Sequence, residues 1–348
     1  MRAVRFHAAR DIRVEDVPEP GEPRHHEVLI RPRTCGICGT DLHEFVAGPI
    51  VTPTEPHPLT GAQNPQILGH EFSADVIATG EDVTSVKPGD RVAVMPLAYC
   101  GQCFYCVRGL NHLCERMGCV GLSWAWGGMG ELATVLEYQV AKVPDDLSYE
   151  QGALIEPAAV AVYGVERGNV KPGDHVLVTG GGPIGQLAVL AAKAAGAAAV
   201  YLSEPNPQRR AHAKSVEPTL TLDPTDLGDA IPAPGVDVAI ECAGNAYALN
   251  DCIANTRRAG TVVQTGLHVG KAEVEPMLWS LNDLTIEGTW CYKVYDWPRI
   301  AGLVASGALP VERIVTSRIA VDDVVPKGFE ILADPQGTEV KVLVEVGG

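Results

Sequence analysis

The chain has 348 residues, which is typical of about two domains, and its 46% hydrophobic and 20% charged residues match an ordinary globular protein. A formal net charge of −16 argues against nucleic acid and against an anionic membrane as partners. Residues 1–8 contain no apolar signal-peptide core, and the longest apolar stretch, 184–195, is too short to cross a bilayer. We therefore expect a soluble, cytoplasmic protein.

Residues 1–155 are rich in short β-forming runs separated by turns. Val28–Pro32 and Arg91–Met95 are two such runs, and the Pro-Gly-Asp turn at 88–90 leads into the second. This pattern predicts a β-rich first domain over residues 1–155.

From His175 the pattern changes to alternating strands and helices. The expected elements are strand His175–Thr179, helix Ile184–Ala195, strand Ala199–Ser203, helix Pro207–Val216, strand Val236–Glu241, helix Ala246–Arg258, strand Thr261–Gly266 and strand Leu284–Gly288. Such alternation predicts parallel βαβ units in a doubly wound sheet, here over residues 156–292. The tail Val340–Val346 is a further β run, so we expect residues 293–348 to return to the first domain.

A glycine-rich turn follows the first strand of this second region. Its sequence, Gly180-Gly-Gly-Pro-Ile-Gly185, satisfies the G-x-G-x-x-G pattern of dinucleotide-binding proteins. Gly180 permits the tight turn, Gly182 lets the backbone approach a pyrophosphate, and Gly185 allows close packing of helix on strand.

An acidic residue, Glu204, ends the next strand, where a carboxylate can accept hydrogen bonds from a ribose 2′-hydroxyl. Because a carboxylate repels a 2′-phosphate, NAD is favoured over NADP, although Arg209 and Arg210 nearby leave some NADP use open. The predicted cofactor-binding residues are Gly180, Gly182, Pro183, Ile184, Gly185, Glu204 and Arg209.

Four cysteines occur within 17 residues, in the spacing C-x2-C-x2-C-x7-C. A disulfide framework, a redox site and a metal site are the possible interpretations. Thiols stay reduced in the cytoplasm, and four thiolates fill the tetrahedral shell of zinc and leave no open position for a substrate. The negative charge disfavours a nucleic-acid zinc ribbon. We therefore predict a structural zinc bound by Cys100, Cys103, Cys106 and Cys114.

A second group of potential ligands is more dispersed. It comprises the segment from Cys35 to His43, the tripeptide Gly69-His70-Glu71, and the pair Glu156-Pro157. Mixed thiolate, imidazole and carboxylate ligands with one open position are typical of a catalytic zinc. From the spacing alone, an ordinary hydrogen-bonded pair of His70 and a glutamate remains an alternative.

Five motifs of this chain resemble, in content and order, those of zinc-dependent medium-chain alcohol dehydrogenases. They are C-G-x-C-G-T-D-x-H, G-H-E, the four-cysteine loop, E-P and G-x-G-x-x-G. The resemblance covers essentially the whole chain. It is closest to the polyol branch, which includes sorbitol, threonine and 2,3-butanediol dehydrogenases. Within that branch, Phe45–Gly61, Leu68–Ser73 and Gly152–Val162 are most similar to the butanediol enzymes.

The resemblance implies an α/β protein with a GroES-like catalytic domain, a Rossmann domain, and an active site between them. It implies that Cys38 and His70 bind the catalytic zinc together with one carboxylate, either Glu156 or Glu71, and that Cys35 is not a ligand. It also assigns the four-cysteine loop to the structural zinc. Relatives are dimers or tetramers, so we expect a homodimer or homotetramer.

The activity implied by the resemblance is reversible oxidation of 2,3-butanediol to acetoin with hydride transfer to NAD. Zinc favours the alkoxide of the bound alcohol, and the proton that is released needs a way out. Thr40 can accept it, the cofactor ribose and His43 can pass it on, and Asp41 is expected to orient His70. The predicted catalytic residues are Thr40, His43, Glu71 and Glu156.

Two other functions remain open at this stage. A sorbitol-like polyol or L-threonine could replace the diol as substrate. A non-catalytic, NAD- and zinc-binding redox regulator is a different class of protein. An intact ligand set and proton relay argue against the regulator, because a sensor would need only the fold.

Overall fold

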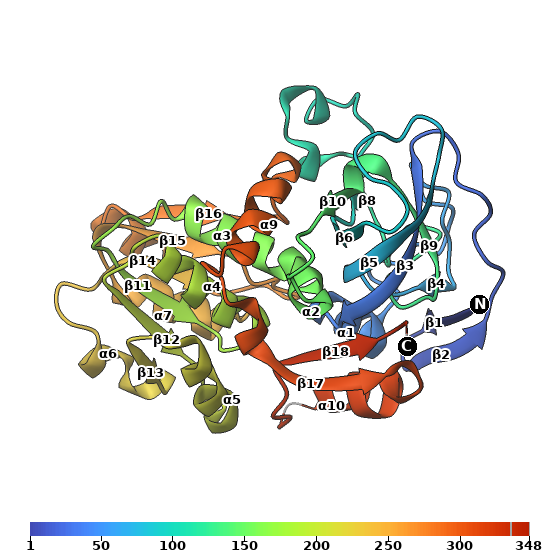
Figure 1. Ribbon diagram of the computed structural model, residues 1–348. Helices are drawn as coiled ribbons and strands as arrows, with labels where there is room; N and C mark the ends of the chain where they lie inside the picture. The colour runs from blue at the N-terminus through green and yellow to red at the C-terminus, as the bar shows by residue number, and fades with distance from the viewer. Residues whose placement is uncertain (335, 348) are drawn as a thin grey trace. The chain divides into compact units, whose positions relative to one another are not determined.

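The structure is a computed structural model that describes residues 1–334 and 336–347. Contacts between residues divide the chain into two compact units (Figure 1). The first, here called the β-rich unit, comprises Met1–Glu156, Lys293–Ala305 and Val315–Gly348; the second, the parallel-sheet unit, comprises Pro157–Tyr292 and Ser306–Ile314. The domain boundaries expected from the sequence remain a proposal.

The β-rich unit is built on a seven-stranded sheet in the order β10-β6-β5-β3-β18-β17, with β9 also paired to β3. Its strands are β3 (Glu27–Gly36), β5 (Glu71–Thr79), β6 (Arg91–Val94), β9 (Ala133–Leu136), β10 (Val140–Lys142), β17 (Val315–Ala320) and β18 (Lys341–Glu345). The C-terminal strand β18 pairs antiparallel with β3, so the end of the chain does return to the first part of the fold.

Smaller elements complete the β-rich unit. They are β1 (Arg2–Ala8), β2 (Asp11–Asp16) and β4 (Gln66–Ile67) in a three-stranded sheet, β7 (Leu97–Ala98) and β8 (Gly118–Cys119) as a pair, and the helices α1 (Gly39–Ala47), α2 (Tyr149–Ala153), α9 (Trp297–Ala305) and α10 (Glu330–Leu332). Apolar side chains from these elements and the large sheet form one core, in which the rings of Phe45 and Phe329 lie 5.4 Å apart.

The parallel-sheet unit contains six parallel strands in the order β13-β12-β11-β14-β15-β16. These are β11 (His175–Thr179), β12 (Ala199–Ser203), β13 (Leu220–Leu222), β14 (Val236–Glu241), β15 (Thr256–Gln264) and β16 (Thr285–Gly288). The order reverses between β11 and β14, which is the doubly wound Rossmann arrangement, in which ligands bind at the carboxyl ends of the strands. The predicted fold class is therefore confirmed.

Helices connect and cover these strands (Figure 1). They are α3 (Ile155–Arg167), which begins in the β-rich unit, followed by α4 (Pro183–Ala194), α5 (Pro207–His212), α6 (Leu227–Ala230), α7 (Ala246–Asn255) and α8 (Pro276–Leu281). In the described part of the chain, no helix is long and apolar enough to cross a membrane.

Two helix predictions need correction. The helix expected over Ala246–Arg258 ends at Asn255, because Thr256 already pairs with Val236 in the sheet. The helix expected over Pro207–Val216 is α-helical only to His212 and continues as a 3₁₀ turn over Ala213–Val216.

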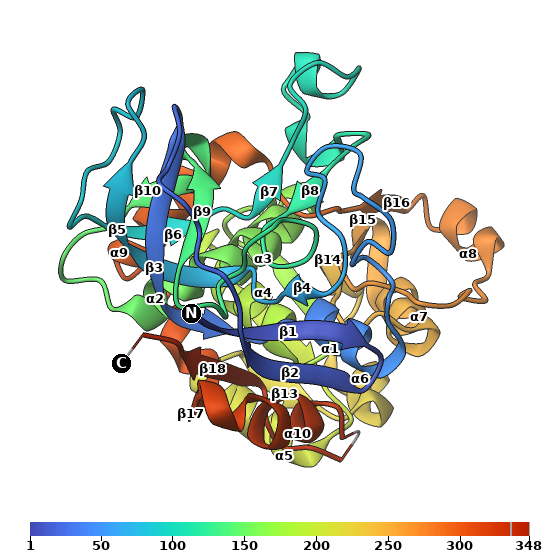
Figure 2. The ribbon, with the colours of Figure 1, turned by 90° about the vertical axis from the view of Figure 1, so that its right-hand side faces the viewer.

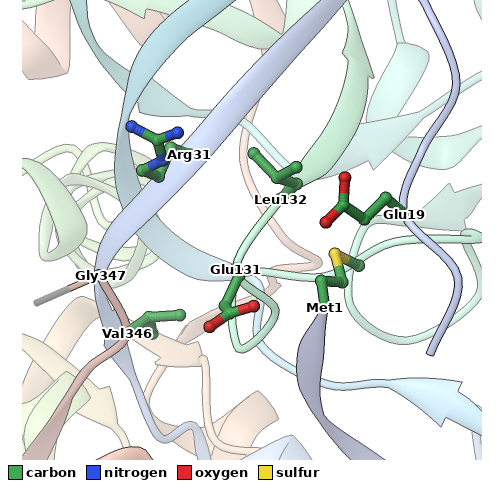
Figure 3. Close-up of a pocket in the computed structure, with 7 residues that line it drawn as sticks. All are labelled: Met1, Glu19, Arg31, Glu131, Leu132, Val346 and Gly347. Atoms are coloured by element: carbon green, nitrogen blue, oxygen red, sulfur yellow. The ribbon is translucent and has the colours of Figure 1, made fainter. Parts of the chain in front are cut away.

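A pocket of about 260 Å³ lies in the β-rich unit (Figure 3). Its lining residues are Met1, Glu19, Arg31, Glu131, Leu132, Val346 and Gly347. Since none of the predicted site residues lines it, this pocket plays no part in the assignment of function.

Candidate functional site

The potential ligands Cys38, His70 and Glu71 come together in the β-rich unit. One ligand atom from each lies within 4.8 Å of the others. Gly36, the last residue of β3, pairs with Glu71, the first residue of β5, so the antiparallel register brings the two ligand-bearing segments side by side. The expected proximity of the thiol, the imidazole and one carboxylate is thus present in the structure.

His70 is buried, and its Nδ1 lies 3.5 Å from Oδ1 of Asp41. Neither atom has a hydrogen-bond partner among the described residues. The other carboxylate oxygen of Asp41 accepts a hydrogen bond of 3.0 Å from the backbone amide of Cys38. Asp41 therefore contacts both the His70 ring and the backbone of the neighbouring thiol, and it leaves the second ring nitrogen available to a metal.

Electrostatic effects on His70 are strong. Burial lowers the pKa of the imidazole, but the charges of Asp41 and Cys38 outweigh burial and hold the pKa well above its ordinary value. Such a concentration of negative charge around a buried imidazole is the environment that a divalent cation stabilises. The donor set of thiolate, imidazole and carboxylate fits zinc in type and number.

Glu71 is also engaged by a residue that the sequence analysis missed. Nζ of Lys341 lies 2.5 Å from Oε2 of Glu71, and both side chains are only 1% exposed. Burial lowers the pKa of Lys341, but the charges of Glu71 and Cys38 outweigh it, so the pKa lies above its ordinary value. The one sequence signal was a lysine inside the apolar run Val340–Val346.

Glu156, the other predicted carboxylate, is the second residue of α3 and is buried. It lies outside the three-residue cluster, although it is close enough to raise the pKa of Lys341 as a minor contributor. Glu156 contributes in the same way at Cys119, whose pKa burial chiefly raises, to about 12. Glu71 faces an ammonium group at hydrogen-bond distance, and of the two candidate carboxylates it is the one that belongs to the three-residue cluster.

The predicted relay residues Thr40 and His43 lie on α1, which begins directly after Cys38. Both side chains are half-buried. Residues three apart in a helix share a face, so the hydroxyl and the imidazole lie on the same side of α1.

The four cysteines of the loop between β7 and β8 also converge. Their Sγ atoms all lie within 4.8 Å of one another, and those of Cys100 and Cys106 are 4.0 Å apart. Sulfur atoms in a disulfide are about 2.05 Å apart, and all ten cysteines, every one of which the structure describes, are free. The disulfide interpretation is therefore excluded in this structure.

Backbone amides donate to these sulfur atoms. The amides of Cys100 and Arg116 donate to Cys114 Sγ at 3.3 and 3.4 Å, and the amide of Cys103 donates to Cys100 Sγ at 3.3 Å. Hydrogen bonds from Gln102 and Cys103 lower the pKa of Cys100 to about 6, whereas burial raises that of Cys106 to about 12. Four preorganised sulfur ligands of this kind suit one structural zinc.

In the parallel-sheet unit, the glycine turn links β11 to α4. Gly180 has φ = 99°, and a Cβ on Gly185 would lie 1.7 Å from the carbonyl oxygen of Gly180, so this packing requires glycine. No described atom lies within 4 Å of a Cβ built on Gly182, and α4 begins at the next residue, Pro183. The turn therefore presents open backbone at a helix N-terminus, the arrangement that binds a pyrophosphate.

Glu204 is buried at the carboxyl end of β12 and contacts this turn. Its Oε2 accepts a hydrogen bond of 2.7 Å from the Gly181 amide, and its Oε1 accepts one of 2.8 Å from the Asn206 amide. Of the two following arginines, Arg210 donates to the carbonyl of Glu204 and pairs with Asp223 at 3.1 Å, and Arg209 keeps a buried Nε without a partner among the described residues.

Comparison with known proteins agrees with this arrangement. Residues 24–145 match the family model of the alcohol dehydrogenase GroES-like domain, and residues 183–306 match that of the zinc-binding dehydrogenase. The chain is also 39% identical over 352 residues to (R,R)-butanediol dehydrogenase of Bacillus subtilis strain 168, covering 99% of each protein. This chain belongs to the zinc-dependent medium-chain alcohol dehydrogenases.

Other dehydrogenases of this family have comparable sequence identity to this chain. A crystal structure of 2R,3R-butanediol dehydrogenase from Bacillus subtilis has a TM-score of 0.91 at 37% identity over 99% of each chain. Sorbitol dehydrogenase of Bacillus subtilis is 33% identical, covering 92% of this chain and 91% of that protein. A zinc-binding dehydrogenase from Sinorhizobium meliloti 1021, with NADP bound, has a TM-score of 0.88 at 34% identity, covering 99% of this chain and 98% of that one.

The family prediction made from the motifs is therefore confirmed, and so is the class of enzyme, a zinc-dependent alcohol or polyol dehydrogenase. The roles predicted for individual site residues, and the specific substrate, remain predictions.

Proposed function

We propose that this dehydrogenase oxidises a vicinal diol, 2,3-butanediol, reversibly to acetoin, with NAD as the hydride acceptor. The observation that carries the proposal is the cluster of half-buried Cys38 with buried His70 and Glu71 in a chain of this family. The similarity along the full length to (R,R)-butanediol dehydrogenase supports the choice of diol. A sorbitol-type polyol is the second candidate, because sorbitol dehydrogenase is 33% identical to this chain.

Cys38, His70 and one carboxylate, Glu156 or Glu71, would hold the catalytic zinc. When bound, zinc supplies Lewis acidity that favours loss of the proton from the substrate hydroxyl. Asp41, 3.5 Å from His70 Nδ1, would keep the ring oriented towards the metal. The thiols of Cys100, Cys103, Cys106 and Cys114 would hold a second, structural zinc.

Thr40 and His43 would remove the hydroxyl proton. The Thr40 side chain can accept a hydrogen bond from the substrate and donate onwards, and His43 can release the proton to solvent because histidine titrates near neutral pH. Their shared face of α1, immediately after Cys38, supports this assignment.

NAD, when bound, supplies the nicotinamide that accepts the hydride. The turn from Gly180 to Gly185, with Pro183 and Ile184 opening α4, would bind the pyrophosphate, and Glu204 would accept hydrogen bonds from the ribose. Glu204 disfavours a 2′-phosphate, whereas Arg209 would be the residue to contact one.

We also propose a homodimer formed through β16. This strand is the last in the six-stranded sheet, and Ile286 within it is 38% exposed. Met277 and Leu281 of α8 and the nearby Trp290 are exposed as well. A second copy of β16 would satisfy the free edge of the strand and cover this apolar surface.

The test of the catalytic site uses Cys38→Ser and His70→Ala. We expect turnover of 2,3-butanediol, followed by NADH absorbance, to fall by ~10³-fold or more, the order reported for loss of one group that stabilises a developing charge. NAD affinity, measured by calorimetry, should change little.

Cys35→Ala is the matched control, because it removes a buried thiol of the same motif that is not assigned to the metal. It should keep the catalytic zinc and most of the activity. Near-normal turnover in either ligand variant would contradict the proposed mechanism. A kcat/KM higher for sorbitol than for 2,3-butanediol in the unmodified enzyme would favour the second candidate.

A further inference from the structure

Glu241 is the last residue of β14 and is fully buried, with 0% of its surface exposed. It pairs with Thr179, the last residue of β11, so it lies where the strand order reverses. Ligands of doubly wound sheets bind at this point, outside the carboxyl ends of the strands. A buried carboxylate loses several kcal/mol of hydration, so its position depends on the hydrogen bonds that it accepts.

Glu241 connects the loops that follow β14 and β15. One carboxylate oxygen, Oε1, accepts hydrogen bonds of 2.7 Å from the amides of Ala243 and Gly244. The backbone carbonyl of Glu241 accepts hydrogen bonds of 2.9 Å from the amides of Thr265 and Gly266. A single residue thus holds the start of both loops.

The loop after β14 also contacts the glycine turn that is proposed to bind the pyrophosphate. A Cβ built on Gly180 would lie 2.9 Å from the backbone nitrogen of Ala243, so the two backbones pack closely. The amide of Cys242 donates a hydrogen bond of 2.8 Å to the carbonyl of Thr179, directly before that turn. A shift of the Glu241 carboxylate would therefore move the backbone against which the glycine turn packs.

The second carboxylate oxygen of Glu241 has a side-chain partner. Oε2 lies 3.2 Å from Nε2 of His268, in the loop after β15, and the histidine side chain is 14% exposed. A carboxylate only accepts hydrogen bonds, so Nε2 carries the hydrogen in this contact. Leu267 and Val269, on either side of the histidine, are 47% and 79% exposed. The polar ring thus turns inward between two outward apolar side chains, the reverse of the usual distribution, which indicates a specific contact.

We propose that His268 is a positioning residue for NAD, which acts through Glu241. By binding Oε2, the imidazole keeps the carboxylate turned so that Oε1 faces the amides of Ala243 and Gly244. The backbone beside the glycine turn is thereby held in place before the cofactor binds. The inference rests on the proposed function for the cofactor, and it goes beyond that function in naming a residue outside the glycine motif that sets cofactor affinity.

The experiment measures the Kd of NAD and of NADP by calorimetry on the zinc-loaded enzyme, together with thermal unfolding without cofactor. His268→Leu removes the ring nitrogens and keeps a side chain of moderate size. The Kd of NAD should rise by about tenfold or more, as for the loss of one hydrogen bond to a charged group. The kcat at saturating NAD should stay within about twofold, because the change affects binding. His268→Gln places an amide nitrogen near the position of Nε2 and should keep the Kd within about twofold.

His7→Leu is the matched control, because Nε2 of His7 also lies 3.2 Å from a glutamate oxygen, Oε1 of Glu15, in the β-rich unit. It should leave the Kd of NAD unchanged. The inference is overturned if His268→Leu binds NAD as tightly as the unmodified enzyme, even if its unfolding temperature falls, or if His268→Gln binds NAD as weakly as His268→Leu.

Should His268→Leu fail to fold, His268→Ala takes its place with the same expected rise in Kd. An unmodified enzyme that binds NADP but not NAD would contradict the proposed cofactor. The same comparison of variants, made with NADP, would then still decide the role of His268. Calorimetry needs no substrate, so an error in the proposed diol would leave the result intact.

Discussion

Glu204 receives two backbone hydrogen bonds, from the amides of Gly181 and Asn206. Its carboxylate is thereby fixed beside the glycine turn before any cofactor binds. A ribose 2′-hydroxyl would donate to an oxygen that is already oriented, whereas a 2′-phosphate would meet a buried negative charge. At the scale of single residues, the proposed preference for NAD would therefore depend on the charge of Glu204.

We expect Glu204→Gln to lower the ratio of kcat/KM with NAD to that with NADP by about tenfold or more, since a hydrogen bond to a charged group contributes ~1.5–3 kcal/mol. The measurement is steady-state kinetics with both cofactors at fixed diol concentration. Asp229→Asn removes the same charge from the exposed side of α6 and should leave the ratio unchanged. An unchanged ratio in Glu204→Gln would remove this residue from the ribose site.

Among the elements, the cysteine loop between β7 and β8 has little apolar support of its own. It projects from the rest of the β-rich unit in Figure 2, and its apolar residues Phe104 and Val107 are 58% and 62% exposed. Only short 3₁₀ turns, Cys106–Arg108 and Asn111–Leu113, order the backbone within it. A metal bound by four thiolates would supply the cross-links that a core supplies elsewhere.

Cys103→Ser should therefore lose the structural zinc and lower the free energy of unfolding by ~2 kcal/mol or more, as for other lost metal ligands. Zinc content and thermal unfolding are the measurements. Turnover measured well below the melting temperature should be largely retained, because the variant is still folded there. Phe104→Ala, an exposed change in the same loop, should keep the zinc. If Cys103→Ser bound as much zinc and melted at the same temperature, the loop would need another explanation.

At the scale of the whole molecule, the proposed homodimer depends on the edge of the six-stranded sheet. The edge strand β16 exposes apolar side chains that a second copy would cover, and a charge placed on such an edge opposes strand pairing. Ile286→Lys should thus convert the dimer to a monomer at micromolar concentration, as measured by analytical ultracentrifugation.

Ile331→Lys in α10 makes the same change at a residue of equal exposure, 39% against 38% for Ile286, and should leave the dimer intact. A dimer that persists in Ile286→Lys would place the interface elsewhere on the surface.

The sequence predicted most of the parallel-sheet unit because strands and helices there follow local patterns. The error at Thr256–Arg258 shows the limit of such patterns. These residues continue a helical pattern, yet Thr256 pairs with Val236 and Arg257 forms an ion pair of 2.7 Å with Asp237. Pairing with a neighbouring strand overrode local propensity, which a single sequence does not reveal.

The amino-acid sequence by itself determined the four-cysteine group and the glycine turn, because each depends on residues at short, fixed spacings, and it determined the family through the order of the motifs along the chain. Only the tertiary structure revealed that Glu71 pairs with Lys341. Lys341 reaches Glu71 across 270 positions of sequence, through the pairing of β18 with β3. Burial strengthens the ion pair between Lys341 and Glu71, and this burial exists only once the sheet has formed.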